Sequence, residues 1–210
     1  MFTEPVQSRA AKREATRQKV LAAAERLFHE QGFGATTVRQ IAAEAAVSTG
    51  TVMSVGDKEA LLVAIFDHWI DDVHRARSAT GAGTDTGAPA AGPPAPGDPV
   101  EAAMALFEPF IRYFAQDREL SREYAAVIVR GQRESVIFQN LALSLITEIE
   151  AVLTPPGRPA ADAGPGARVV YFAYLGLLMT FANGALDEHD ARDRLREVIE
   201  FAIAREGEER

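Results

Sequence analysis

The chain has 210 residues, 47% of them hydrophobic, a formal net charge of −8 and no cysteine. This length allows one large domain or two small ones, each with a sizeable core. The lack of cysteine excludes a disulfide framework and thiolate chemistry.

The charge is divided unevenly along the chain. Residues 1–60 carry eight Lys and Arg against seven Asp and Glu, a net +1, whereas the other 150 residues carry 14 against 23, a net −9. The basic residues nearest the N-terminus are Arg9, Lys12, Arg13, Arg17 and Lys19. A DNA-contacting module joined to an acidic body fits this division, and a solvated basic arm is the alternative.

The first periodic stretch predicts an amphipathic helix that ends at Gly32. Its apolar positions recur at helical spacing: Val20, Ala23, Ala24, Leu27 and Phe28. Gly32 can adopt the left-handed conformation of a C-cap without a side-chain clash.

Two short helices joined by a tight turn come next. Thr37 and Gln40 have the spacing of a capping box, and Ser48 can cap a second helix over Thr49–Ser54. The inner face of the first is formed by Val38, Ile41, Ala42 and Ala45. The outer face of the second is left free, and such a helix fits the major groove of duplex DNA.

A long helix is predicted over residues 57–79. Gly56 breaks the preceding helix and Asp57 caps this one. Its apolar face consists of Leu61, Leu62, Ile65, Phe66, Trp69 and Val73.

The stretch Thr16–Trp69 resembles the N-terminal domain of the tetracycline-repressor (TetR/AcrR) family of bacterial regulators. The matching positions are Ala24, Leu27, Phe28, Gly32, Ala35 to Val38, Ile41, Ala42, Ala46 to Ser48, Gly50 to Val52, Lys58, Glu59 and Leu61. The resemblance implies a homodimer that binds a double-stranded, pseudo-palindromic operator and is released by a small, largely apolar effector.

One departure concerns the recognition helix. Where the family usually has Tyr after Gly-Thr-aliphatic, this chain has Met53, and the aromatic residues that follow are missing too. The family's Tyr hydrogen-bonds a DNA phosphate, which Met53 cannot do; such a contact contributes about 1 kcal/mol. Ser54 is a substitute donor.

From position and resemblance we expect these DNA-binding residues: Thr37, Arg39, Thr49, Gly50, Thr51, Ser54 and Lys58. Thr37 and Lys58 are expected on phosphates, and Arg39 and Thr49 on base edges. The helix-turn-helix domain is predicted to occupy residues 1–56.

Two segments rich in Pro, Gly and small residues interrupt the helical pattern. Residues 80–98 hold four prolines and no large apolar side chain, which predicts a flexible linker, and residues 154–166 form a second loop. A helical body for ligand binding and dimerisation then spans residues 99–210. The predicted fold is therefore all-α throughout.

The body's helices are readable from caps and apolar periodicity. Asp98 and Pro99 open the first, Pro109 lies inside it, and further helices carry Tyr124, Val127 and Ile128, and then Val136 to Val152. The last runs from about Asp187. Its expected inner face is Leu195, Val198, Ile199, Ala202 and Ile203, and its outer face is Arg192, Arg194, Glu197 and Glu200.

An uncharged run of 18 residues, Val169–Leu186, just reaches the length that spans a bilayer. Its Asn, Thr, Gly and Tyr content favours a helix buried on all sides, and we expect no membrane partner. Gly176, Thr180 and Gly184 recur every fourth residue and predict a close helix–helix seam. In the family such helices form the dimer interface, here expected to pair with Leu195, Val198, Ile199 and Ala202.

The resemblance also implies an effector pocket in the body. The candidate ligand-binding residues are Phe107, Phe110, Arg112, Tyr113, Phe114, Tyr124, Phe138, Tyr171 and Tyr174. The alternative is that these aromatic residues only form the core and Arg112 lies on a solvated face.

The sequence gives little support to an enzymatic function. His68, Asp71, Asp72 and His74 cluster on the long helix, and His68 and Asp72, four residues apart, could share a metal. No other nearby residue completes a ligand set, so a solvated helix face is the better interpretation. We therefore expect no catalytic residue, no metal and no cofactor, in a cytoplasmic ligand-responsive repressor. The alternative is an all-α small-molecule-binding or interaction protein that has lost operator binding.

Overall fold

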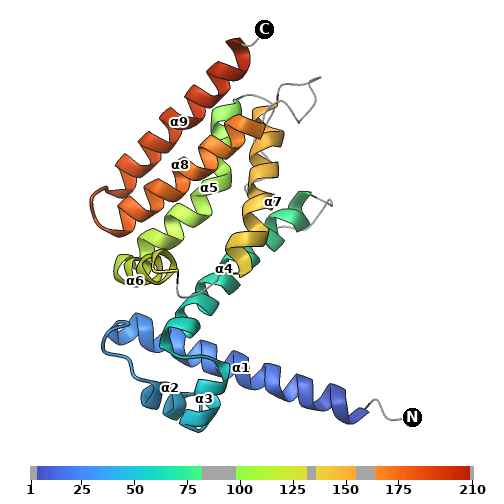
Figure 1. Ribbon diagram of the computed structural model, residues 1–210, viewed down its shortest axis with the longest axis vertical. Coiled ribbons are helices and arrows are strands. Elements are labelled where there is room, and N and C mark those ends of the chain that lie inside the picture. Colours follow the sequence, from blue (N-terminus) through green and yellow to red (C-terminus); the bar gives the residue numbers. More distant parts are fainter. Residues whose placement is uncertain (1–3, 82–97, 132–135, 155–163, 209–210) are drawn as a thin grey trace. The chain divides into compact units, whose positions relative to one another are not determined.

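The structure is a computed structural model that describes residues 4–81, 98–131, 136–154 and 164–208 (Figure 1). All regular secondary structure in these residues is α-helical, which confirms the predicted fold class. The helices are α1 (Glu4–Gln31), α2 (Val38–Glu44), α3 (Thr49–Val55), α4 (Lys58–Gly81), α5 (Pro99–Gln116), α6 (Arg118–Val129), α7 (Val136–Leu153), α8 (Gly164–Ala182) and α9 (Glu188–Glu208).

The chain divides into two compact units. The first consists of Met1–His68 with Glu123–Ser135, and the second of Trp69–Arg122 with Val136–Arg210. Both α4 and α6 therefore contribute residues to both units. Most of the segment predicted as a linker, residues 82–97, lies outside the described residues.

The predicted caps of the first unit are confirmed. Gly32 has a φ of 82° after α1, and its amide donates to the carbonyl of Phe28. The Thr37 hydroxyl accepts from the Gln40 amide while the Gln40 side chain accepts from the Thr37 amide. The Ser48 hydroxyl accepts from the amide of Thr51.

The core of the first unit joins α1, α2 and α3 to the start of α4. Its fully buried side chains are Val20, Phe28, Ile41, Val52, Leu61, Leu62, Phe66 and Tyr124. Within this unit the ring of Phe66 on α4 stacks on that of Tyr124 on α6, with centroids 4.1 Å apart. Burying large apolar side chains of this kind contributes about 1.5–3 kcal/mol each.

The second unit is a bundle in which α5, α7, α8 and α9 each contact the other three. Figure 1 shows α8 and α9 as antiparallel neighbours. Asp98 caps α5 through the amide of Val100, and Pro109 lies inside this helix as predicted. An ion pair between Arg192 of α9 and Glu108 of α5 ties two of the helices together, with nitrogen and oxygen 2.8 Å apart.

Three predictions about the second unit were wrong. Helix α8 begins at Gly164, inside the predicted second loop, because Pro165 is tolerated in a first turn. Helix α8 is not buried on all sides, since Val169 and Phe172 are exposed. Arg192 does not simply point outward, because Glu108 and Glu188 pair with it.

Helix α8 is long and apolar enough to cross a membrane by length and composition, with a mean hydropathy of 1.2. Its inner face, however, packs on α7 and α9 and buries Tyr171, Tyr174 and Phe181. This packing is that of a core helix in a bundle.

Candidate functional site

The first candidate site is the outer surface of α2, the turn and α3. Ala46 in the turn has a φ of 53°, and the amide of Val47 donates to the carbonyl of Ala42. Val52 is fully buried and fastens α3 to the core. The opposite side of α3 is thereby exposed, and it includes Thr49 and Gly50.

Most of the predicted DNA-binding residues share this surface. Arg39, Thr37, Thr49, Gly50 and Ser54 are exposed, and Thr51 is half-buried. The hydroxyls of Thr51 and Ser48 lie 2.9 Å apart, and that of Ser54 donates to the Thr51 carbonyl. These contacts link both ends of α3 to Thr51 in its middle.

Gly50 has no packing reason to be glycine. A Cβ placed there would meet only the Ser48 hydroxyl, at an ordinary 3.7 Å. Gly50 lies in the first turn of α3, and the missing side chain lets another molecule approach the helix backbone closely there. Gly56 differs, since a Cβ there would lie 2.8 Å from that of Ala60.

Lys58 is held by its own unit. Its ammonium donates to the carbonyls of Phe33 at 2.8 Å and Thr36 at 3.1 Å, and it lies over the Phe33 ring. One of its three donors is left for a phosphate. The structure therefore gives Lys58 a structural role that the sequence did not indicate, and its predicted phosphate contact stays a prediction.

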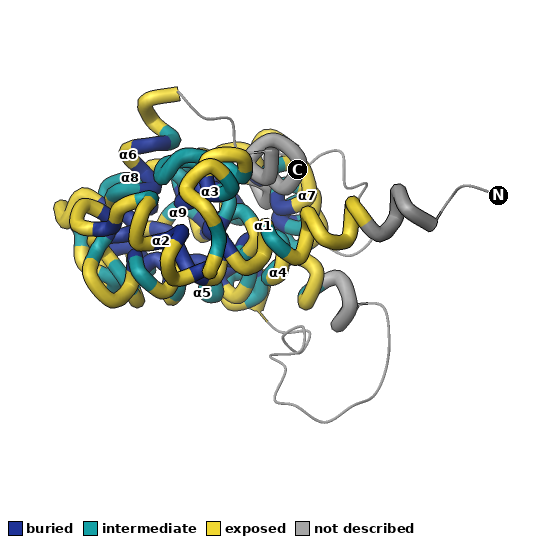
Figure 2. The backbone as a smooth tube through the Cα atoms, turned by 90° about the horizontal axis from the view of Figure 1, so that it is seen from below, coloured by how far each residue is buried: buried dark blue, intermediate teal, exposed yellow. Residues whose placement is uncertain are grey.

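Two arginines near α3 were absent from the predicted set. A cleft between α1 and α3 is lined by Ala10, Arg13, Glu14, Thr16, Arg17, Thr51, Ser54 and Val55. Figure 2 shows this N-terminal part of α1 as exposed. The excess of basic residues in the arm was the available signal for Arg13 and Arg17, and positive charge beside a recognition helix attracts phosphates.

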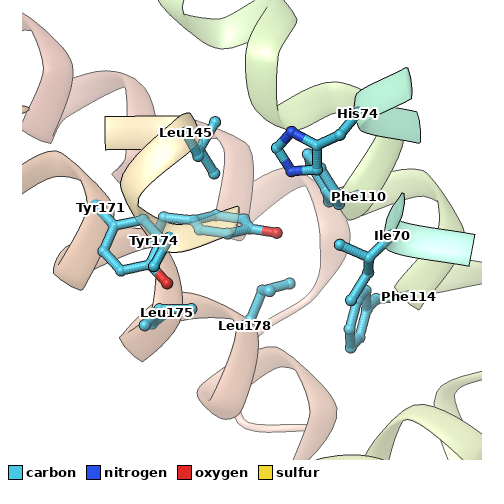
Figure 3. A pocket seen from close by; sticks show the side chains of 10 residues that line it. Ile70, His74, Phe110, Phe114, Leu145, Tyr171, Tyr174, Leu175 and Leu178 are labelled. Atoms are coloured by element: carbon cyan, nitrogen blue, oxygen red, sulfur yellow. The ribbon is translucent and has the colours of Figure 1, made fainter. Parts of the chain in front are cut away.

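The second candidate site is an apolar cavity inside the second unit, drawn in Figure 3. Its volume is about 50 Å³, room for a few water molecules. Four predicted ligand-binding residues line it: Phe110, Phe114, Tyr171 and Tyr174. The other six lining residues were not predicted from the sequence: Ile70, His74, Ala142, Leu145, Leu175 and Leu178.

The remaining predicted ligand-binding residues lie elsewhere. Phe107 is fully buried and its ring contacts Tyr174 at 4.7 Å, behind the cavity wall. Tyr113 stacks on Trp69, and Arg112 is exposed. Tyr124 belongs to the first unit. The side chain of Phe138 lies outside the described residues.

His74 corrects the prediction of a solvated helix face. It is only 5% exposed, and its Nδ1 lies 3.5 Å from a carboxylate oxygen of Glu148. Arg77 pairs with the same carboxylate at 2.8 Å and donates to the Leu106 carbonyl. Among the described residues no group of three or more His, Cys, Asp or Glu is placed to hold a metal.

The carboxyl of Glu148 is shifted by opposing effects. Burial raises its pKa, but the hydrogen bond from His74 and the charge of Arg77 together lower the pKa by more than burial raises it. The pKa of Glu148 therefore lies below its ordinary value. A carboxylate with a lowered pKa stabilises the fold at pH values above the unfolded pKa. This stability is lost as the pH falls through the folded pKa.

We therefore expect Glu148→Gln to lower the free energy of unfolding by about 1–2 kcal/mol at pH 7, because charged hydrogen bonds are lost. The difference from the unchanged protein should begin to shrink as the pH falls below about 4, where the unfolded state takes up the proton, and should vanish below the lower folded pKa. Urea unfolding at a series of pH values measures this, and a difference that does not vary with pH would contradict it.

Comparisons with known proteins agree with this geometry. Residues 20–65 match the family described as "Bacterial regulatory proteins, tetR family". Over 59 residues the chain is 42% identical to the HTH-type transcriptional regulator HbdR of Aromatoleum sp. (strain CIB), which is 28% of this chain and 26% of that protein. The match thus spans about a quarter of this relative's length.

Solved structures match over most of the chain. A TetR transcriptional regulator from Rhodococcus sp. RHA1 is 19% identical with a TM-score of 0.65, covering 90% of this chain and 96% of that one. FadR of Thermus thermophilus, a TetR family transcriptional repressor in complex with lauroyl-CoA, is 20% identical with a TM-score of 0.58, covering 89% and 93%. NalD, the secondary repressor of the MexAB-OprM multidrug efflux pump in Pseudomonas aeruginosa, is 18% identical at 0.51, covering 90% and 95%. At these identities the likeness shows a shared fold.

Proposed function

We propose that the protein is a ligand-responsive transcriptional repressor of the tetR family of bacterial regulatory proteins, whose N-terminal domain residues 20–65 match. It binds a pseudo-palindromic operator as a homodimer and is released by a small, largely apolar effector. The observation that carries this proposal is the pairing of an exposed α3, fixed by buried Val52, with an apolar cavity in the second unit.

The proposed DNA contacts follow from exposure and chemistry. Arg39 has a guanidinium fork that fits a guanine edge, and Gly50 and Thr49 allow α3 to approach the groove floor. Arg13 and Arg17, beside α3, are added as phosphate contacts. We propose no catalytic activity and no cofactor, and a cytoplasmic location, where the operator is accessible.

A gel shift with DNA from the region upstream of the protein's own gene tests the proposal. We expect a retarded complex that survives excess unrelated DNA. The competing proposal, a small-molecule-binding or interaction protein without an operator, is favoured by Met53, which stands exposed where the family has a phosphate-binding Tyr. Ligand binding without any specific retardation would select that alternative.

The dimer is proposed to form through the outer faces of α8 and α9. Val169, Phe172 and Gly176 are exposed on one side of α8, and Phe201 is exposed on α9. Exposed apolar side chains that cluster in this way are typical of interfaces. The earlier expectation for α9 was wrong, because Leu195, Ile199 and Ala202 are buried within one chain.

The predicted seam of small residues on α8 is also shorter than expected, because the helix ends at Ala182. Gly184 lies beyond α8 in a turn with a φ of 77°, where the amide of Ala185 donates to the Thr180 carbonyl. Gly176 and Thr180 remain on the helix. A Cβ at Gly176 would meet no atom within 4 Å in the protomer.

We therefore expect Gly176→Leu to give a monomer whose fold is intact. Leucine is the better helix former by about 1 kcal/mol and meets no obstacle within the chain, whereas it would keep a partner helix away. Sedimentation equilibrium at micromolar concentration measures the association, and circular dichroism checks the fold. A monomeric wild-type protein, or a variant that dimerises as well as wild type, would refute this interface.

A further inference from the structure

The apolar cavity has one wall that differs from the rest. Most of its lining is aliphatic or aromatic, but His74 contributes an imidazole that is 5% exposed and faces the tyrosines of α8 (Figure 3). Polar groups in such pockets fix the orientation of the ligand and decide its chemical class.

The polar contacts of His74 with the described residues involve only one of its two ring nitrogens. Its Nδ1 lies 3.5 Å from Glu148 and 3.3 Å from an Arg77 nitrogen. These contacts use Nδ1, which leaves Nε2 for a ligand in the cavity.

The cluster around His74 has more donors than acceptors. One oxygen of Glu148 accepts from Arg77, and the other faces His74. The Arg77 Nε is buried and finds no acceptor in the described part of the chain. Arg77 and Glu148 cancel in charge, so this pair does not repel an anion in the cavity. An acidic group there would supply an acceptor for a charge-assisted hydrogen bond from His74.

We propose that the effector is an apolar molecule with a single carboxylate, which His74 holds through Nε2. This inference rests on the proposed ligand-responsive function and names the ligand class. His74 donates Nε2–H to a carboxylate oxygen, while Glu148 and Arg77 hold the ring at Nδ1. The apolar body of the ligand displaces side chains that line the small cavity, such as Leu145 and Leu178.

The fluorescence of Trp69 gives a direct readout without DNA. It is the only tryptophan in the chain, and its ring meets that of Phe110 edge-on at 5.7 Å. Phe110 lines the cavity. A ligand that enters should therefore change the emission of Trp69.

The experiment titrates the full chain with matched pairs of probes: hexanoate, octanoate, decanoate, benzoate and naphthoate, each against its alcohol. We expect at least one acid to bind tenfold or more tightly than its alcohol. His74→Leu should abolish this preference, because both members of a pair then meet only apolar surface. His189→Leu is the matched control, since His189 is exposed on α9, and it should keep the preference.

Three outcomes would overturn the proposal: equal binding of acids and alcohols, a preference that survives in His74→Leu, or no acid bound at millimolar concentration. Failure here is distinct from failure of the proposed function. A protein that binds its operator but no acid remains a regulator, with a ligand of another class. A protein that binds acids but no specific DNA supports this inference and refutes operator binding.

Discussion

Replacing Trp69 with alanine is expected to abolish the effect of the ligand on operator affinity, while DNA and ligand both still bind. The Trp69 ring stacks on Tyr113, with centroids 3.7 Å apart, and touches Phe110 in the cavity wall. One helical turn earlier, Phe66 packs in the core of the first unit. Removing the indole therefore removes the packing of α4 on Tyr113 and Phe110, whereas Ile70 and His74 of the same helix still line the cavity.

The expected change can be stated as a ratio of affinities. A ligand that weakens operator binding tenfold needs about 1.4 kcal/mol of unequal binding to the two states. In Trp69→Ala the ratio should fall below twofold, with about 2–3 kcal/mol lost from stability. Fluorescence anisotropy of labelled operator, with and without a ligand recovered from protein purified from its host, measures it. Trp69→Phe, which keeps a ring, is the control.

The alternative to transmission of the ligand response through α4 is transmission along the chain through residues 82–97. Shortening that segment by several residues should change the ligand response little, because its sequence holds no large apolar side chain that could transmit a shift. If the deletion abolished the response while Trp69→Ala preserved it, the proposed route through α4 would be wrong.

Replacing Arg39 with alanine is expected to weaken operator binding by about 1–3 kcal/mol, or roughly 5- to 150-fold, and to relax the preference at one base pair. The side chain is exposed on α2, beside the face of α3 that is free for DNA. Arg39→Lys should recover little, since lysine keeps the charge but lacks the guanidinium fork.

Competition binding with operators altered one position at a time measures both affinity and preference. Arg194→Ala is the matched control, because Arg194 is equally exposed but lies on α9. An Arg39→Ala variant with unchanged affinity and unchanged base preference would contradict the assignment.

The local features of the first unit could be predicted because short-range rules determine them. A left-handed C-cap favours glycine, which Gly32 supplies. A capping box needs Ser or Thr three residues before Glu or Gln, as with Thr37 and Gln40. The role of Lys58 could not be predicted, because the carbonyls that it binds belong to Phe33 and Thr36, more than 20 residues away.

The second unit shows a different limit. Helical periodicity identifies the apolar face of a helix but not what covers it. On α9 the face with Leu195 and Ile199 is covered by the chain itself, whereas Phe201 is exposed. His74 was misjudged for the same reason: its charged neighbours along α4 suggested a solvated face, while its partner Glu148 comes from α7. The cavity likewise joins residues from four helices that no local pattern brings together.

Sequence-specific DNA binding by a symmetric dimer can be measured directly. The measurement compares the affinity for a pseudo-palindromic operator, found by selection from genomic fragments, with the affinity for a scrambled duplex at 0.15 M salt. We expect half-sites about one helical turn apart and at least about 1,000-fold tighter binding to the operator than to the scrambled duplex. If both duplexes bind with equal affinity, and both affinities fall to the same extent as the salt concentration is raised, sequence-specific binding is contradicted.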